Sequence, residues 1–303
     1  MSVDDDAGPP VLAASGLEVR YGRRLLLDGL SLEAKRGQVV ALLGRNGSGK
    51  TSLVRCLLGQ QKPTRGTARL FGRDAWTGRR QVMERVGVLP EEPDAPASMT
   101  AEDLSDFCRR LYPRWDAAAV RSRLDRFGVP QDRPFSRLSR GERGAVMLAL
   151  SLGHSPELLV LDDPTLGLDA VARRALFEEV IGELADRGTT VFVTSHDLTG
   201  IETLADRIGI LHAGRLLVDE PLEALKARFR RLRVAVDAPV EWGPFEVVAS
   251  RTQPWGHEAT VSNFDDGRWE AFLQGRADRT VEVAGLTLEE IFLALCGGKG
   301  AGA

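Results

Sequence analysis

The segment GRNGSGKT, residues 44–51, is the feature that most constrains the fold of this chain. It follows the short apolar run QVVALL and precedes a helical pattern from Lys50 to about Leu58, so it joins a buried strand to a helix. Its glycines leave backbone N–H groups open to phosphate oxygens, and the helix start presents a positive end. These glycines are Gly44, Gly47 and Gly49. The segment therefore predicts a phosphate-binding loop; the alternative is a glycine-rich turn that binds nothing.

The side chains of this loop suit a nucleotide accompanied by a metal ion. Lys50 is placed to reach the β- and γ-phosphates, and the Thr51 hydroxyl can bind Mg²⁺. Asn46, Ser48 and Ser52 lie in the same segment and complete the predicted nucleotide-binding set. ATP and Mg²⁺ are the expected ligands.

Two adjacent carboxylates end a second apolar run, ELLVLDDP. An ATPase with such a loop needs an aspartate at the tip of a neighbouring hydrophobic strand to hold Mg²⁺. Asp162 takes that place, and Asp163 stands where a base that orients the attacking water is expected. The alternative is that one aspartate only caps the next segment, because Asp-Pro often starts a turn.

The order of strand and helix patterns predicts an α/β fold. Short apolar runs at 87–89, 157–162 and 189–195 alternate with helical patterns, which favours a mostly parallel sheet covered on both faces. Strand-like patterns also fill 11–34. Between about 98 and 155 strand signals stop and three helices follow one another, so a helical insert is expected there.

The pattern changes again after Pro221, where short strands stand between a first helix and a last one. We expect a domain over 11–222, a small accessory domain over 223–303 with a disordered tail, and a flexible tail over 1–10. The segment KARFRRLR, residues 226–233, has two explanations that the sequence leaves open. It is either a solvated helix face or linker, or it is a contact for anionic headgroups or a partner's cytoplasmic loop.

Composition and charge narrow the class of protein further. The net charge of −3 offers no basic field for nucleic acid. Three scattered cysteines without metal spacing indicate reduced thiols and a cytosolic compartment. The acidic first ten residues lack the features of a secretory signal, and no apolar run approaches the ~18 residues of a membrane span.

With these motifs in place, the chain resembles the ATP-binding subunit of ABC transporters over about residues 11–220. Tyr21 in VRYG matches the aromatic residue that stacks on adenine, and Glu91 in LPEEP stands at the Gln-loop position. LSRGE at 138–142 is similar to the signature loop, LGLD at 166–169 to the dimer-contact loop, and TSHD at 194–197 to the switch-histidine motif. The family fold is a P-loop ATPase core with an antiparallel β subdomain and a helical insert, here followed by a small α+β domain.

The resemblance implies a role for each matching residue. His196 would contact the γ-phosphate and couple it to Asp163, with Glu91 near Mg²⁺, and Asp169 would contact a second copy. The signature residues would bind the ATP of that copy in trans; they are Ser139, Arg140, Gly141 and Glu142. From the residues alone, Ser139 and Glu142 form a capping box that opens the next helix.

The family logic therefore requires two copies, most simply a homodimer, and an integral membrane permease. The expected place is the cytoplasmic face of the cell membrane, reached through the permease. The segments LPEEP and LTLEEIFLAL are similar to those of subunits that drive exporters with separate permeases.

Three departures from the family pattern put turnover in doubt. Glu91 replaces the usual Gln, Asp163 the usual Glu, and Arg140-Gly141-Glu142 the usual Gly-Gly-Gln. Asp is one methylene shorter than Glu and reaches the attacking water less well. One alternative follows from them: a regulatory subunit that binds ATP with little or no hydrolysis. A second alternative, independent of these departures, is a soluble ABC ATPase without a transport role.

Overall fold

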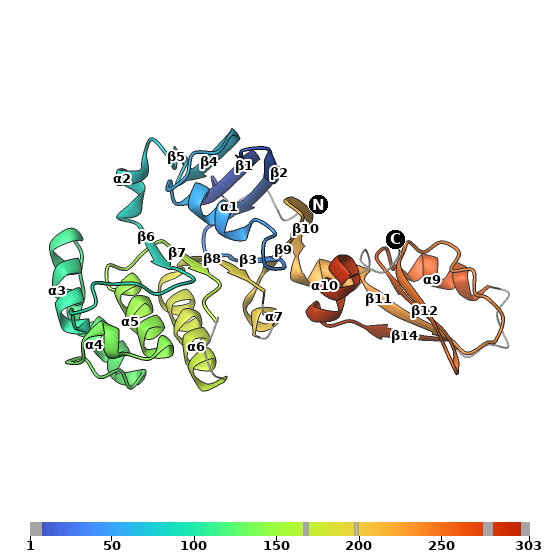
Figure 1. The fold of residues 1–303 in the computed structure, drawn as a ribbon. Helices are drawn as coiled ribbons and strands as arrows, with labels where there is room; N and C mark the ends of the chain where they lie inside the picture. Colours follow the sequence, from blue (N-terminus) through green and yellow to red (C-terminus); the bar gives the residue numbers. More distant parts are fainter. Residues whose placement is uncertain (1–7, 166–169, 197, 199, 275–280, 298–303) are drawn as a thin grey trace. The chain divides into compact units, whose positions relative to one another are not determined.

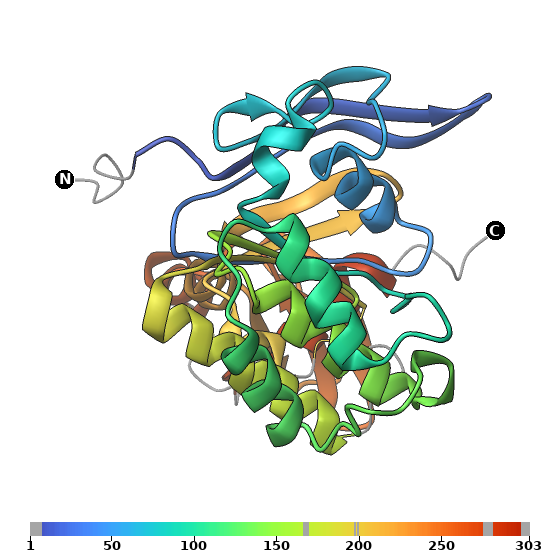
Figure 2. The ribbon, with the colours of Figure 1, turned by 90° about the vertical axis from the view of Figure 1, so that its left-hand side faces the viewer.

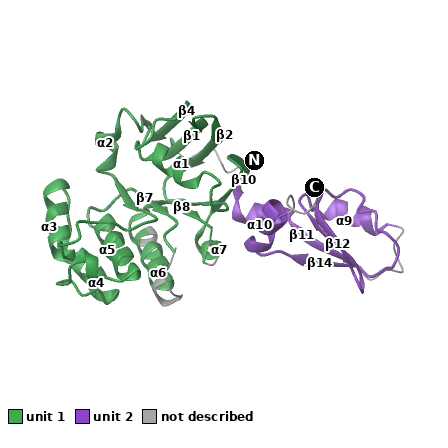
Figure 3. Cartoon of the chain, viewed as in Figure 1, with its two compact units in different colours: residues 1–219 green, residues 220–303 purple. Residues whose placement is uncertain are grey.

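The computed structural model describes residues 8–165, 170–196, 198, 200–274 and 281–297. The chain divides into two compact units, residues 1–219 and 220–303 (Figure 3). Among the helices of the described residues, none has both the length and the apolar character needed to cross a membrane.

A six-stranded sheet forms the centre of the first unit, with the order β10-β9-β3-β8-β7-β6. Parallel pairing joins β9 to β3, β3 to β8, β8 to β7 and β7 to β6. The strands are β3 (Val39–Leu43), β6 (Val86–Leu89), β7 (Leu158–Asp162), β8 (Thr190–Ser195), β9 (Arg207–His212) and β10 (Arg215–Pro221). Every residue of β3, β7 and β8 is buried, as the continuous apolar runs predict for strands covered on both faces. The predicted α/β class with a mostly parallel sheet is confirmed.

A second, antiparallel sheet has the order β2-β1-β4-β5. Its strands are β1 (Leu12–Tyr21), β2 (Arg24–Ala34), β4 (Arg65–Leu70) and β5 (Arg73–Asp74). Helix α1 (Lys50–Leu57) contacts both this sheet and β7 of the central sheet (Figure 1). One apolar core joins the three layers, including Leu12 of β1, Leu53 of α1 and Val160 of β7. The phosphate-binding loop therefore leaves the central sheet and enters a helix held between two sheets.

The helical insert consists of α3 (Ala101–Leu111), α4 (Ala117–Arg126), a 3-10 turn η1 (Phe135–Arg137) and α5 (Arg140–Leu152). Figures 1 and 2 both show these green helices beside α6 (Ala170–Arg187), below the central sheet. Within the described chain, the insert's apolar core takes its buried members from residues 101–150. The insert thus has a core of its own. The remaining helices of this unit are α2 (Arg79–Met83) and α7 (Ile201–Leu204).

The second unit contains a four-stranded sheet of order β12-β13-β11-β14, with antiparallel pairing between neighbours. Its elements are α8 (Leu222–Arg228), β11 (Arg230–Val234), β12 (Val247–Gln253), β13 (Gly256–Val261), α9 (Asp266–Leu273), β14 (Val281–Gly285) and α10 (Leu288–Gly297). One face of the sheet packs on a core rich in aromatic rings, including Phe245 and Phe272.

Three arginines of the basic segment 226–233 pair with carboxylates within the second unit. Arg228 pairs with Glu220, and Arg231 pairs with Glu290. Arg233 donates to the buried Glu258, which also accepts from an arginine of β12. These intramolecular partners explain the arginines better than a solvated helix face does, and they favour neither a headgroup contact nor a partner's loop.

Candidate functional site

Packing forces glycine at two positions of the loop between β3 and α1. A Cβ atom on Gly44 would lie 2.5 Å from the Ser48 Oγ and 2.8 Å from the Leu211 carbonyl oxygen. At Gly49 the backbone has φ 114°, and a Cβ atom would lie 2.6 Å from the Leu27 Cδ2. The protein itself therefore crowds these two glycines, in addition to the access for phosphate that their small size provides.

Lys50 is held inside the loop that it follows. Its side chain is buried, and Nζ donates a hydrogen bond of 2.7 Å to the Gly44 carbonyl oxygen. Burial lowers the pKa of Lys50, and the carboxylates of Asp163, Asp162 and Glu91 oppose this effect. The ammonium group thus has a fixed place among negative charges, close to the backbone where phosphates are expected.

A cavity of about 380 Å³ opens beside the loop. Its lining joins the loop to Glu91 and Asp163, which come from two other parts of the chain. The loop residues that line it are Asn46, Gly47, Gly49, Lys50, Thr51 and Ser52. Ser48 is buried, and its Oγ has no hydrogen-bonding partner among the described residues. These residues form one concave polar site at the carboxyl end of β3.

Arg24 and Leu26 of β2 also line this cavity, and sequence motifs did not identify them. They lie in the strand that follows the Tyr21–Gly22 turn. The sequence YGRRLLL predicts this strand, but it contains no motif that identifies the two residues as part of a binding site. Arg24 is exposed, which suits a contact with a phosphate or with an adenine ring.

Asp162 lies at the end of β7, next to β8. It is buried, and its Oδ1 accepts a 2.5 Å hydrogen bond from the Thr194 hydroxyl. Burial raises the pKa of Asp162, because a carboxylate here lacks water. A nearby cation would offset that cost.

Asp163 is the most constrained residue of the site. Its φ of 50° is in the left-handed region, and its N–H donates to the Thr194 carbonyl oxygen at 3.0 Å. One carboxylate oxygen lies 2.6 Å from the His196 Nδ1. The other oxygen, Oδ1, is buried and has no hydrogen-bonding partner within the described part of the chain. This arrangement leaves one oxygen for a water molecule or a ligand.

The residues present fit a magnesium ion that a nucleotide brings with it. Mg²⁺ is usually held by one or two carboxylates together with substrate phosphates and water. Thr51 and Glu91 line the cavity, and Asp162 supplies a buried carboxylate near Lys50. Among the described residues, no group of three or more acidic, His or Cys side chains could hold a metal by itself. Thr51, Glu91 and Asp162 provide oxygen ligands of the kind that Mg²⁺ uses together with substrate phosphates.

The predicted capping box at the start of α5 is present. The Ser139 Oγ accepts from the Glu142 N–H at 3.2 Å, and the Glu142 carboxylate accepts from the Ser139 N–H at 2.6 Å. The N–H group of Ser139 holds the pKa of Glu142 below its usual range. Ser139 and Arg140 are exposed, Gly141 is half-buried, and in the described chain none of the four lines the cavity.

Ser139→Ala is expected to lower the free energy of unfolding by about 1 kcal/mol, because the first turn of α5 loses a hydrogen-bond acceptor. Urea denaturation of the purified chain measures this effect. Ser139→Thr is the matched control, since its hydroxyl still accepts from the Glu142 N–H. Equal midpoints for the unmodified chain and the alanine variant would contradict the capping role.

Two predicted site residues remain to be placed. Tyr21 is 51% exposed, and its hydroxyl donates to the Gln61 Oε1 at 2.8 Å, outside the described lining of the cavity. Asp169 lies outside the described residues. Of the other histidines, His154 is buried and stacks on Tyr112.

Comparisons with known proteins find related sequences over most of this chain. The family model described as "ABC transporter" matches residues 27–166. The ABC transporter ATP-binding protein YtrB of Bacillus subtilis is 30% identical over 280 residues, covering 92% of this chain and 95% of that protein. A Nod factor export ATP-binding protein of Burkholderia orbicola is 32% identical, covering 93% and 95%. The bacitracin transport ATP-binding protein BcrA of Bacillus licheniformis is also 32% identical and covers 73% of each chain.

Solved structures show the same fold. An ATP-binding subunit of an ABC transporter superposes with a TM-score of 0.65 at 26% identity, covering 71% of this chain and 92% of that one. A dimeric bacterial ABC transporter cassette superposes with a TM-score of 0.63 at 21% identity, covering 70% and 98%. The shared part has the size of the first unit.

Proposed function

Because this chain belongs to the ATP-binding subunits of ABC transporters, we propose that it hydrolyses ATP to energise export through a membrane permease. The observation that carries the proposal is the position of Asp163, which lines the loop cavity and contacts His196 at 2.6 Å. Export is supported by relatives that are named for bacitracin transport and for Nod factor export.

In this proposal each group around the cavity has a separate task. The loop N–H groups and Lys50 bind the phosphates of ATP, and Asp163 orients the attacking water. His196 holds the Asp163 carboxylate and contacts the γ-phosphate. Bound Mg²⁺, held by Thr51, Asp162 and Glu91, would neutralise the negative charge of the phosphates. The short Asp163 side chain favours slow turnover.

A second copy of the chain completes the site. The exposed helix start at Ser139 and Arg140 presents N–H groups with a positive end, which suits the γ-phosphate of ATP held by another copy. The dimeric cassette among the structural relatives supports this arrangement. Asp169 is proposed to contact the second copy near its loop.

The permease is proposed to dock on the helical insert, and so to hold the chain at the cytoplasmic face of the membrane. Phe107 and Leu111 lie one turn apart on α3 and are 53% and 59% exposed. Large apolar side chains exposed together are typical of protein contacts.

Phe107→Asp is expected to weaken docking by about 2 kcal/mol, or roughly 30-fold in affinity, because an apolar anchor becomes charged. The measurement is the fraction of the full-length chain that co-sediments with membranes of the source cell. Leu217→Asp changes an exposed leucine of β10 in the same way and is the matched control. Equal co-sedimentation of all three chains would contradict docking on α3.

The function itself is tested with the purified chain, Mg²⁺ and ATP. We expect ATP to be retained and phosphate to be released, with faster release when the chain is bound to those membranes. Retention without release in both settings would instead support a regulatory subunit that binds ATP. A chain that fails to retain ATP would contradict the proposal.

A further inference from the structure

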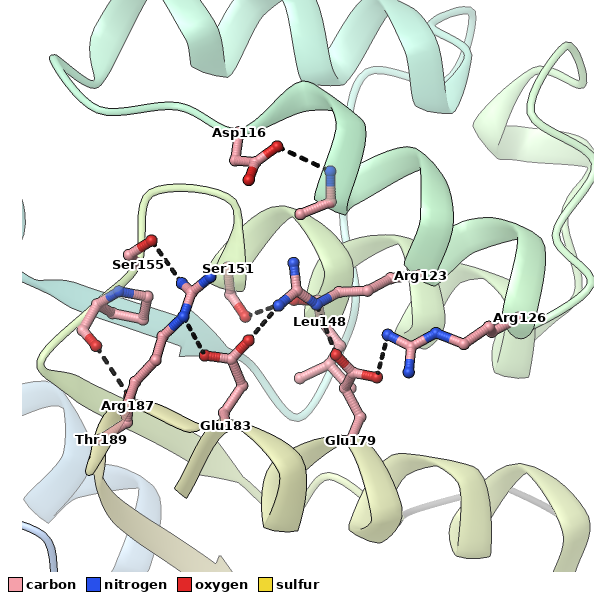
Figure 4. A network of polar contacts seen from close by, with 12 residues as sticks. Asp116, Arg123, Arg126, Leu148, Ser151, Ser155, Glu179, Glu183, Arg187 and Thr189 are labelled. Atoms are coloured by element: carbon pink, nitrogen blue, oxygen red, sulfur yellow. Dashed lines mark hydrogen bonds and ion pairs between the residues drawn. The ribbon is translucent and has the colours of Figure 1, made fainter. Parts of the chain in front are cut away.

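A buried charged network joins the helical insert to α6 (Figure 4). Arg123 of α4 is 5% exposed and donates through Nε to the Glu179 Oε1 at 2.5 Å. Its Nη2 donates to Glu183, one turn further along α6. Both glutamates are buried. One guanidinium group therefore contacts two carboxylates that lie 56 and 60 residues away in sequence.

Two outer arginines complete the network. Arg126 Nη2 lies 2.8 Å from the Glu179 Oε2, and Arg187 Nε lies 3.7 Å from the Glu183 Oε2. Arg187 also donates to Ser155 in the turn after α5. Each glutamate is thus placed between two guanidinium groups, which compensates its charge in the absence of water.

The network lies where two separate packing units meet. α4 belongs to the insert, whose core brings Val120 and Leu124 together with Val146 and Ala149 of α5. α6 follows Asp163 in the sequence, and its Phe177 and Val180 side chains are buried. Fixing α4 on α6 therefore gives α5, and with it the helix start at Ser139, a second attachment besides its direct contact with β6 of the central sheet.

The chemistry of the Arg123 contacts suits a role in positioning the two helices better than a role in stabilising the fold. A buried ion pair adds little net stability compared with apolar side chains of similar size. The planar guanidinium, however, donates in fixed directions, so few orientations of the two helices satisfy both carboxylates. Apolar packing at the same place would tolerate sliding of the insert on α6.

We propose that Arg123 is a positioning residue that holds Ser139 and its helix start in the orientation that meets ATP bound by a second copy. This inference rests on the proposed function, since it requires that the helix start acts in trans. Arg123 contacts no predicted ligand and acts through the insert.

Mixed dimers of full-length chains with two affinity tags test the proposal. The reference dimer pairs the Asp163→Asn chain with an unmodified chain and has one competent site. In the separated arrangement, Arg123→Met is placed on the chain that keeps Asp163. In the combined arrangement, Arg123→Met is placed on the Asp163→Asn chain, whose helix start serves the competent site of its partner.

If Arg123 positions the helix start, the combined dimer falls below the reference and the separated dimer matches it. A misplacement of about 1 Å can cost about 100-fold, so we expect ATP turnover to fall about 10- to 100-fold in the combined dimer. A residue that only stabilises its own chain would lower both dimers alike. Equal effects, or loss in the separated dimer alone, would overturn the proposal.

A second measurement tests the proposal if the reference dimer, with one blocked site, shows no ATP turnover. In the Asp163→Asn background, Arg123→Met is expected to weaken ATP-dependent dimerisation at least about 10-fold while ATP affinity of the single chain stays unchanged. Equal losses in both quantities, or no loss in either, would overturn the proposal. Arg121→Met is the matched control, because Arg121 lies on the same helix in an exposed pair with Glu102.

An apolar triple variant separates the effect of the network on the stability of the fold from its effect on the position of the helix start. Arg123→Met with Glu179→Met and Glu183→Met removes all three buried charges and is expected to recover the melting temperature lost in Arg123→Met. Its combined dimer is still expected to turn over slowly; full recovery of turnover would overturn the proposal. If the unmodified chain neither binds ATP nor dimerises with it, the proposed function fails first; if it does both and Arg123→Met changes nothing, only this inference fails.

Discussion

The Asp163→Asn variant is expected to bind ATP as the unmodified chain does and to turn it over about 10²- to 10⁴-fold more slowly. The amide keeps the shape of the carboxylate and can still contact the His196 Nδ1, so the cavity keeps its form. It lacks the negative charge and basicity needed to orient and deprotonate water. Phosphate release and equilibrium binding of ATP, measured on the same preparation, check both parts.

The Asp186→Asn variant is the control for Asp163→Asn. Asp186 is an exposed aspartate of α6, so it undergoes the same chemical change outside the site. Unchanged turnover in Asp163→Asn would refute the assignment of the base. Loss of ATP binding would instead show that this carboxylate holds the metal, a role assigned here to Asp162.

The Lys50→Ala variant is expected to lose about 10²- to 10⁴-fold in ATP affinity. Each hydrogen bond from a charged donor contributes about 1.5–3 kcal/mol, and the ammonium group can give two to the phosphates, or about 3–6 kcal/mol. Its buried position in the cavity increases this effect, because little water competes. Equilibrium dialysis with ATP and Mg²⁺ measures the loss.

The Lys62→Ala variant, at an exposed lysine after α1, controls for the loss of one positive charge. Thermal unfolding must accompany the Lys50 measurement, since its Nζ also holds the Gly44 carbonyl oxygen. A folded Lys50→Ala chain that retains ATP like the unmodified chain would disprove the whole phosphate-binding assignment.

Local motifs carried most of the prediction. The strand–loop–helix unit at 44–51 and the capping box at Ser139 depend on residues a few positions apart, so spacing alone determines them. The alternation of buried runs and helical patterns was enough to predict the class of the sheet.

Contacts between distant segments could not be predicted. Nothing near Arg123 in the sequence distinguishes it from Arg121, yet one is buried against α6 and the other is exposed. Arg24 lines the cavity because β2 passes beside the loop, which only the folded chain determines. The Thr194 hydroxyl near Asp162 depends in the same way on the pairing of β7 with β8.

The crowding of Gly44 and Gly49 by Leu211 and Leu27 has a consequence for the affinity of the loop for nucleotides. A loop that the surrounding protein presses into one conformation has already lost its conformational entropy when the chain folds. Each arriving nucleotide then meets a preorganised receptor and does not have to order it, so more of the contact energy is expressed as affinity.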